Sequence, residues 1–276
     1  KRYDIRCRNC AKYFAGILFR KQNSEIKNLK QSLYRRESFF MKKLIADMHM
    51  HTLVSGHAYG TIREMAATAG EKNLKLIGIT EHAPGIPGTV DPFYYLNLTV
   101  IPRVLSNVQI LHGCEINVLN GGKLSLEQKY IDFLDYAIVG IHKECYTDEG
   151  KEKNTDNLIA CMKNEKVHFV SHPDDAHTPL DYERLVSAAK QYRVALEVNN
   201  SSLVKKDRRL NCYENYRKML KLCEQQQVPI IISSDAHDPS WVGRFDLAVK
   251  LLEELQFDES LILTNDIEKL RAFIGV

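Results

Sequence analysis

The stretch Asp47-Met48-His49-Met50-His51-Thr52 follows directly on a short apolar run, residues 44–46, which is typical of a buried strand. Alternate residues of a strand face the same side, so His49 and His51 are expected to point the same way, with Asp47 behind them. Two imidazoles on one face are the beginning of a metal site, and His57 follows five positions after Thr52. Taken alone, the stretch is equally consistent with two histidines that are simply polar residues on a half-exposed strand and bind no metal.

From Met41 onward the chain repeats one pattern, in which an apolar strand is followed by a polar strand end and then a helix. After the first strand, the pattern predicts strands at 76–80, 108–111, 136–141, 167–170, 194–198 and 229–232, and helices at 61–73, 154–164, 181–192, 212–226, 245–255 and 266–274. Seven such units indicate an α/β protein with a parallel sheet covered by helices. An open doubly wound sheet concentrates its site at one switch point, whereas a barrel gathers all strand ends around one mouth. Because polar or ligand-type residues follow every strand, we predict a seven-stranded (β/α) barrel.

Composition is that of an ordinary soluble globular protein, with 44% hydrophobic and 26% charged residues over 276 residues. The sequence has no apolar run near the roughly 18 residues that a bilayer span requires, so we expect no membrane partner. Seven scattered cysteines without an evident secretory signal favour reduced thiols and a cytoplasmic protein.

Charge is divided unevenly along the chain. Residues 1–40 contain 11 Lys and Arg against 3 Asp and Glu, whereas the remainder contains 27 against 32, a net of −5. We therefore predict a basic N-terminal extension at 1–40 that lies outside the fold, and one domain at 41–276. The extension is either upstream sequence before a natural start at Met41, which we favour, or a helical arm with a short helix at 25–34. The mildly acidic main part argues against a nucleic-acid partner.

Histidines gather where the predicted strands end. Six of the ten histidines lie at or just past a strand end and a seventh lies in the first loop, namely His49, His51, His82, His142, His172, His237 and His57. Glu115 follows the third strand and Asp235 follows the seventh. Nine donors are too many for one four-coordinate ion, but with Glu115 bridging they divide into three sites of four, three and three bonds.

The donor set also suggests which ions and ligands bind. Imidazole-rich ligation with a few carboxylates suits zinc, manganese or iron better than magnesium or calcium, and of these we expect zinc, with manganese or iron as the alternatives. Three divalent ions and two carboxylates leave positive charge at the mouth, which attracts small phosphate esters. We therefore expect a small phosphorylated substrate.

Eight segments match a known family, in order from residue 41 to about residue 265: they are 47–52, 55–59, 79–82, 113–117, 140–142, 171–173, 197–201 and 234–237. In these segments the sequence resembles the PHP (polymerase and histidinol phosphatase) superfamily, and among its members the YcdX-type bacterial phosphatases. The resemblance implies a distorted (β/α)7 barrel of PHP type. Residues 1–40 lie outside the part of the chain that resembles this family.

The resemblance also implies three metal subsites. The first would be formed by His49, His51, Glu115 and Asp235, the second by Glu115, His142 and His172, and the third by His57, His82 and His237. Among these, Glu115, His142 and Asp235 are the predicted catalytic residues. The one departure is Glu81, where relatives commonly have Asp, and it affects the orientation of the ligands rather than metal binding.

Residues beside the ligands are assigned supporting roles. Asp47 is predicted to accept a hydrogen bond from a ligand imidazole and Glu81 to orient the ligands; for Asp47 the alternative is a strand-end carboxylate in water. The residues predicted to contact substrate phosphate are Arg103, Asn199, Asn200, Arg208 and Arg209, the last two in a basic loop with Lys205 and Lys206. The alternative for this loop is a solvated charged surface.

Together these features predict a metal-dependent phosphatase that hydrolyses a small phosphate monoester with a water activated by the metals. A phosphodiesterase or nuclease with the same metal centre is the first alternative. A non-catalytic metal-binding PHP domain is the second, although none of the expected ligands is missing. A homo-oligomer is compatible with the sequence.

Overall fold

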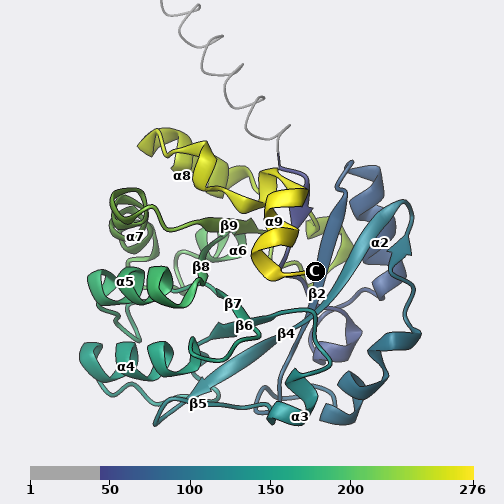
Figure 1. Cartoon of the computed structure of the whole chain (residues 1–276), viewed down its shortest axis with the longest axis horizontal. Coiled ribbons are helices and arrows are strands. Elements are labelled where there is room, and N and C mark those ends of the chain that lie inside the picture. The colour runs from purple at the N-terminus through teal and green to yellow at the C-terminus, as the bar shows by residue number, and fades with distance from the viewer. Residues whose placement is uncertain (1–43) are drawn as a thin grey trace, which may run out of the picture. The chain divides into compact units, whose positions relative to one another are not determined.

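The computed structural model describes residues 44–276, so the predicted extension at 1–40 and the start at Met41 lie outside the described residues. Seven strands pair in parallel, in chain order and without a reversal: β1 (Ala46–Asp47), β2 (Leu76–His82), β4 (Val108–Leu119), β6 (Ala137–Gly140), β7 (Val167–Val170), β8 (Ala195–Asn199) and β9 (Ile230–Ser233). A bridge between Met50 and Ala236 joins the chain just beyond β1 to the chain just beyond β9, so the sheet forms a nearly closed barrel (Figure 1). Because a doubly wound sheet would reverse its strand order, the predicted barrel is confirmed.

Most of the predicted helices lie within three residues of their expected bounds. They are α2 (Ile62–Glu71), α4 (Lys151–Cys161), α5 (Tyr182–Tyr192), α7 (Cys212–Gln226), α8 (Asp246–Leu255) and α9 (Ile267–Ile274). A capping box begins α2, since Thr61 accepts from the Glu64 amide and the Glu64 carboxylate accepts from the Thr61 amide at 2.8 Å. Figure 1 shows α4, α5 and α7 side by side on the outside of the barrel.

The part between β2 and β6 departs from the regular pattern. It contains short elements that the sequence analysis did not predict: the 3-10 segment η2 (Pro92–Val100), the antiparallel strands β3 (Val104–Leu105) and β5 (Lys123–Leu124), and the single turn α3 (Gln128–Ile131). Two of the seven units therefore lack a long helix. In the unit that follows β2, Pro84, Pro87 and Pro92 prevent a long helix, because proline lacks the amide hydrogen that a helix needs.

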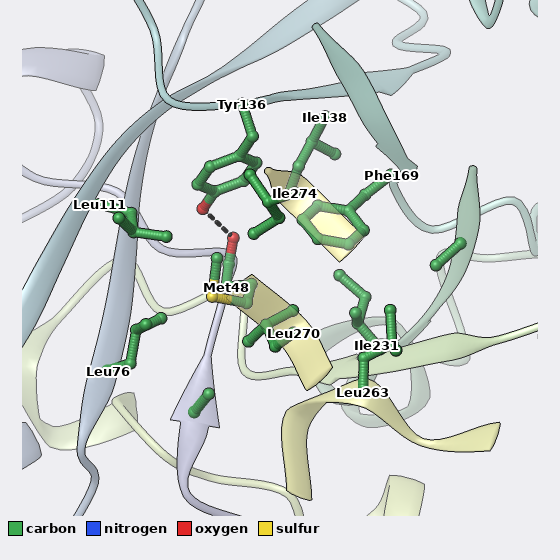
Figure 2. Close-up of a cluster of buried hydrophobic side chains, with 12 residues drawn as sticks. Met48, Leu76, Leu111, Tyr136, Ile138, Phe169, Ile231, Leu263, Leu270 and Ile274 are labelled. Carbon is green, nitrogen blue, oxygen red and sulfur yellow. Dashed lines mark hydrogen bonds between the residues drawn. The ribbon is translucent and has the colours of Figure 1, made fainter. Parts of the chain in front are cut away.

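The hydrophobic core fills the barrel near the strand starts. Figure 2 shows side chains from the barrel strands meeting Leu270 and Ile274 of α9. These barrel residues are Ala46, Met48, Leu76, Leu111, Tyr136, Ile138, Phe169, Ala195 and Ile231. Helix α9 thus closes the end of the barrel where the strands begin, and the opposite end is left for the polar residues.

Two glycines make room for one large core residue. The Tyr136 hydroxyl donates a 2.7 Å hydrogen bond to the Met48 carbonyl inside the barrel (Figure 2). A Cβ atom at Gly78 would lie 1.7 Å from that hydroxyl, and one at Gly113 would lie 2.9 Å from the Tyr136 ring. Both strands therefore require glycine for this close approach.

The five cysteines of the described part are free thiols. Among residues 44–276, no helix combines the length and the apolar character needed to cross a membrane.

Candidate metal centre

The nine predicted ligands meet at the end of the barrel opposite α9. His82 and Glu115 are register neighbours on β2 and β4. His172 follows β7 and brings its Nε2 to 2.9 Å from Glu115 Oε1. His237 follows β9 and places its Nε2 3.2 Å from the Nε2 of His57. Side chains that are up to 188 residues apart in the sequence therefore form one cluster.

Hydrogen bonds fix which nitrogen of the first two imidazoles is free. Nδ1 of His49 lies 2.7 Å from a carboxylate oxygen of Glu197, which can only accept, so Nδ1 carries the hydrogen. Nδ1 of His51 lies 3.0 Å from the hydroxyl of Ser55, whose own hydrogen is donated to Glu81. When these rings are neutral, each Nε2 therefore presents a lone pair.

These lone pairs converge with carboxylate oxygens at a spacing that suits a metal ion. The two Nε2 atoms of His49 and His51 are 3.1 Å apart. They lie 3.3 and 3.5 Å from Glu115 Oε2, and 3.7 and 3.3 Å from Asp235 Oδ1. A tetrahedral ion with bonds of about 2.0–2.1 Å holds its ligand atoms about 3.3–3.4 Å apart. The four side chains have the chemistry and the spacing for one divalent ion.

Glu115 presents both of its oxygens to imidazoles. Oε1 lies 2.9 Å from His172 Nε2 and 3.3 Å from His142 Nε2, and Oε2 lies 2.9 Å from His82 Nδ1. The side chain is 1% exposed. Burial alone would raise the pKa of Glu115, but His49, His142 and His82 hold it well below the usual value. The carboxylate is therefore ionised and has the geometry to bridge two cations.

A third group of imidazoles lies at the rim. His237 donates from Nδ1 to the Asp235 carbonyl at 3.0 Å, so its Nε2 lone pair faces the Nε2 of His57. The rings of His57 and His82 are stacked with their centroids 5.0 Å apart. His82 also lies within reach of the ligand atoms of Glu115 and His142, and of His51 and His237, so it stands between the groups.

The charges in the centre favour a cation there. Burial would lower the pKa of His49, but Glu197, Glu115 and Asp235 raise it well above the usual value. Burial, together with neighbouring imidazoles, holds the pKa of His51 well below its usual value. In the absence of metal, the carboxylates thus draw a proton onto one imidazole, and a divalent ion would supply the same compensating charge.

Two of the predicted ligands have a strained backbone conformation. His172 has φ of 29° and Asp235 has φ of 50°, which is the left-handed region that non-glycine residues seldom adopt. Each such residue costs about 1–3 kcal/mol and persists only where the surroundings enforce it. Strain at two strand ends that both face the cluster indicates a functional site.

Several residues that orient the ligands were not assigned that role from the sequence. Glu197 on β8 holds His49, and Asn117 on β4 accepts a 2.8 Å hydrogen bond from His142 Nδ1. Ser55 contacts His51 and donates at 2.6 Å to Glu81, the residue to which the sequence did assign an orienting role. Glu197 had a visible signal, because it is the one charged residue in the apolar strand 194–198.

The prediction for Asp47 was wrong. Its carboxylate accepts from the amides of Ser234 at 3.0 Å and Gly243 at 2.9 Å rather than from an imidazole. Burial raises the pKa of Asp47 to about 6 against the effect of these bonds. Strand β1 ends at Asp47, so the strand alternation that placed Asp47 behind His49 does not extend past it.

Two of the predicted substrate contacts were also wrong. Arg103 lies next to β3 at the start of β4 and pairs with Asp135, at the opposite end of the strand from Glu115. Asn200 is fully buried, and its side-chain oxygen accepts from two amides in the first turn of α8, at 2.9 and 3.0 Å. These side chains serve the fold.

The remaining predicted substrate contacts lie closer to the cluster. Asn199 is buried and donates from Nδ2 to Glu197 at 3.1 Å and to Asp235 at 3.2 Å. Arg209 donates to the His172 carbonyl at 3.4 Å and to Asp174 at 3.3 Å.

The rest of the basic loop is more exposed. Arg208 and Lys205 have exposed side chains. Burial lowers the pKa of His237, and the charge of Lys205 acts in the same direction. The basic loop therefore reaches the rim of the centre.

A model of the family described as the PHP domain matches residues 47–203, which is more than half of the chain. The chain belongs to the PHP domain family. This PHP protein is 37% identical to a probable phosphatase of Caldanaerobacter subterraneus, over 84% of its own length and 91% of the relative's. It is 36% identical to a probable phosphatase of Clostridium novyi, over 84% of its own length and 95% of the relative's. With relatives of this kind matched over nearly their whole length, the PHP protein is a phosphatase, a hydrolase of phosphoric esters.

The fold has a counterpart among solved PHP structures. A histidinol phosphate phosphatase from Lactococcus lactis, solved with zinc, L-histidinol and phosphate, superposes with a TM-score of 0.56 at 17% identity. The match covers 78% of this chain and 95% of that one. At this identity the likeness establishes the fold, and it agrees with the distorted (β/α)7 barrel that the sequence predicts.

Proposed function

We propose that this PHP-family phosphatase hydrolyses small phosphate monoesters at a centre of three divalent metal ions. The observation that carries the proposal is the convergence of free imidazole nitrogens and carboxylate oxygens 2.9–3.7 Å apart at the strand ends. Acceptor atoms this close repel one another unless a proton or a metal ion lies between them, and several divalent ions would compensate the whole cluster.

The donor atoms divide among three ions as the resemblance implies. In this proposal Glu115 would be shared by the first and second ions. The second and third ions, with three protein ligands each, would keep an open position, which suits catalysis rather than structure, because a purely structural zinc site is closed by four protein ligands. The first ion would have His49, His51, Glu115 and Asp235; the second Glu115, His142 and His172; the third His57, His82 and His237.

Zinc is proposed as the most suitable ion, with manganese or iron as alternatives. Seven of the nine ligands are imidazoles, which favour these metals over magnesium or calcium. The structural neighbour from Lactococcus lactis was solved with zinc, and this supports the same choice here.

Divalent ions bound here would lower the pKa of a water towards neutrality and offset the negative charge that develops on the phosphate oxygens. The protein holds its ligands rigidly through buried hydrogen bonds, so little reorganisation is needed during the reaction. Asp235 is the proposed proton-transfer group. Its Oδ1 faces the imidazoles of His49 and His51, while its Oδ2 accepts from Asn199 at 3.2 Å.

The proposed substrate is a small phosphate monoester. The Arg209 side chain is 21% exposed beside His172, and the unused donors of its guanidinium group could bind a phosphate oxygen. Arg208 and Lys205 would add positive charge at the rim. Histidinol phosphate phosphatase activity of the structural neighbour supports a small phosphorylated substrate as well.

The test is elemental analysis of full-length protein purified without chelator, followed by a screen for phosphate release. Two to three ions per chain, with turnover that chelator abolishes and zinc restores, are expected. Fewer than two ions per chain would overturn the proposal. A generic monoester should be hydrolysed in preference to a diester or a short oligonucleotide, and the reverse preference would favour the phosphodiesterase alternative.

A further inference from the structure

Strand β8 is the parallel strand of the described barrel that supplies none of the nine ligands. Its central acidic residue, Glu197, is nevertheless fully buried among them. Oε1 of Glu197 accepts from His49 Nδ1 at 2.7 Å, and Oε2 accepts from the backbone amide of His172, also at 2.7 Å. One carboxylate therefore contacts a ligand of the first subsite and a ligand of the second.

The two contacts do different things. The bond to Nδ1 fixes the tautomer of His49, so that Nε2 is the nitrogen left for a metal. The bond to the backbone amide holds His172 at its φ of 29°, a conformation that the chain would otherwise tend to leave. Without that bond, Nε2 of His172 is not fixed beside Glu115 Oε1.

The carboxylate is itself held in place. Asn199 donates from Nδ2 to Glu197 Oε2 at 3.1 Å and to Asp235 Oδ2 at 3.2 Å. Its Oδ1 accepts from the Ser202 amide at 2.9 Å, at the start of α6 (Asn200–Val204). The network therefore runs from β8 to ligands that follow β1, β7 and β9.

We propose that Glu197 is a positioning residue that couples the first and second metal subsites, so that the affinity of both ions depends on it. This inference rests on the proposed function for the existence and membership of the two subsites. The competing explanation is that Glu197 only neutralises a protonated His49 in the fold. That explanation predicts a change in stability without a paired change in metal affinity.

The decisive variant is Glu197→Gln in the full chain. An amide has one oxygen, so the glutamine side chain would keep either the contact with His49 or the contacts with His172 and Asn199, and its NH2 group would face the other side. Because the two subsites are coupled in this proposal, losing either contact weakens both. We expect the zinc affinity of two ions to fall about 10–100-fold each, the range found when a group that supports metal ligands is replaced. The third ion, at His57, His82 and His237, should be unaffected.

Asn117→Ala is the matched control, because Asn117 orients His142 alone among the ligands. Zinc occupancy is measured for wild type and both variants by competition with graded chelator, and cobalt substitution reports ligand geometry from the visible absorption spectrum. Asn117→Ala should weaken one ion and Glu197→Gln should weaken two. Weakening of one ion or none in Glu197→Gln, or of two ions in both variants, would overturn the inference.

A second measurement does not depend on how the variants fold. In zinc-loaded wild-type protein with ¹⁵N-labelled histidine, His49 should bind zinc through Nε2 and keep a protonated Nδ1. Zinc bound at Nδ1 would overturn the inference. If wild type itself takes up fewer than two ions, the proposed function fails first; if it loads fully and Glu197→Gln loads equally well, only the coupling fails.

Discussion

Ser55→Ala tests how the first metal ligands are oriented, because the Ser55 hydroxyl uses all three of its hydrogen-bonding positions. It donates to Glu81 at 2.6 Å, accepts from His51 Nδ1 at 3.0 Å and accepts from the His82 amide at 3.0 Å. The residue is fully buried, so water cannot take over these bonds. Alanine removes the oxygen and leaves the rest of the side chain in place.

Two magnitudes follow from this geometry. The buried amide of His82 loses its acceptor, which costs about 1–3 kcal/mol of unfolding free energy. The His51 tautomer is no longer fixed, so zinc affinity at the first subsite should fall about 10–100-fold. That fall corresponds to about 1.4–2.8 kcal/mol of binding free energy.

Urea unfolding of the metal-free protein measures the first effect, and chelator competition measures the second. Ser187→Ala is the control, since that hydroxyl is exposed and bonds only to Gln226, at 3.2 Å. The control should behave as wild type in both assays. Zinc affinity within twofold of wild type in Ser55→Ala would refute the role assigned to the hydroxyl, and with it the supporting role of Glu81.

Three further predictions address the ligands, the core and one buried histidine. His142→Ala and Asp235→Ala should each lower the rate of phosphate release by more than about 100-fold, the upper limit for groups that act through a ligand, while circular dichroism shows a folded barrel; near-normal rates would refute their catalytic roles. Gly78→Ala should lower the unfolding free energy by at least about 1–3 kcal/mol, because its Cβ would lie 1.7 Å from the Tyr136 hydroxyl, and Tyr136→Phe in the same protein should recover part of the loss. Burial lowers the pKa of His112 to about 4, whereas the unfolded value is near 6.5, so the unfolded state binds a proton first. The stability that neutral His112 contributes is complete above pH 6.5 and is lost as the pH falls towards 4. Urea unfolding of the metal-free protein should show that wild type loses about 3 kcal/mol more unfolding free energy over this range than His112→Gln does. Parallel pH profiles of the two proteins would contradict the pKa shift.

Most of the architecture could be predicted because it depends on local patterns. The nearly continuous apolar runs at 167–170, interrupted only by His168, and at 229–232 have the length and β-branched content of buried parallel strands. Helix α7 begins and ends at the predicted residues 212 and 226. The region between β2 and β6 could not be predicted in the same way. Its short strands β3 and β5 depend on pairing with β4, which is a tertiary contact with little local signal.

Which side chains reach the mouth of the barrel follows from the order of residues along the chain. A residue that follows a parallel strand must emerge at the carboxyl end of the sheet, so the position of His142 or Asp235 along the chain already implied a common site. The residue types are equally legible in the sequence, and seven imidazoles with two carboxylates favour the metals proposed for this site.

How those side chains are supported depends instead on contacts between distant segments of the chain. Asp47 is two residues from His49 yet bonds to the amides of Ser234 and Gly243, whereas Glu197 is 148 residues away and holds the His49 ring. Hydrogen-bond partners depend on distances of a few tenths of an ångström and on where each strand ends, and β1 ends at Asp47. Such distances are set by the packing of seven strands and α9 around one core, so no local pattern in the sequence contains them.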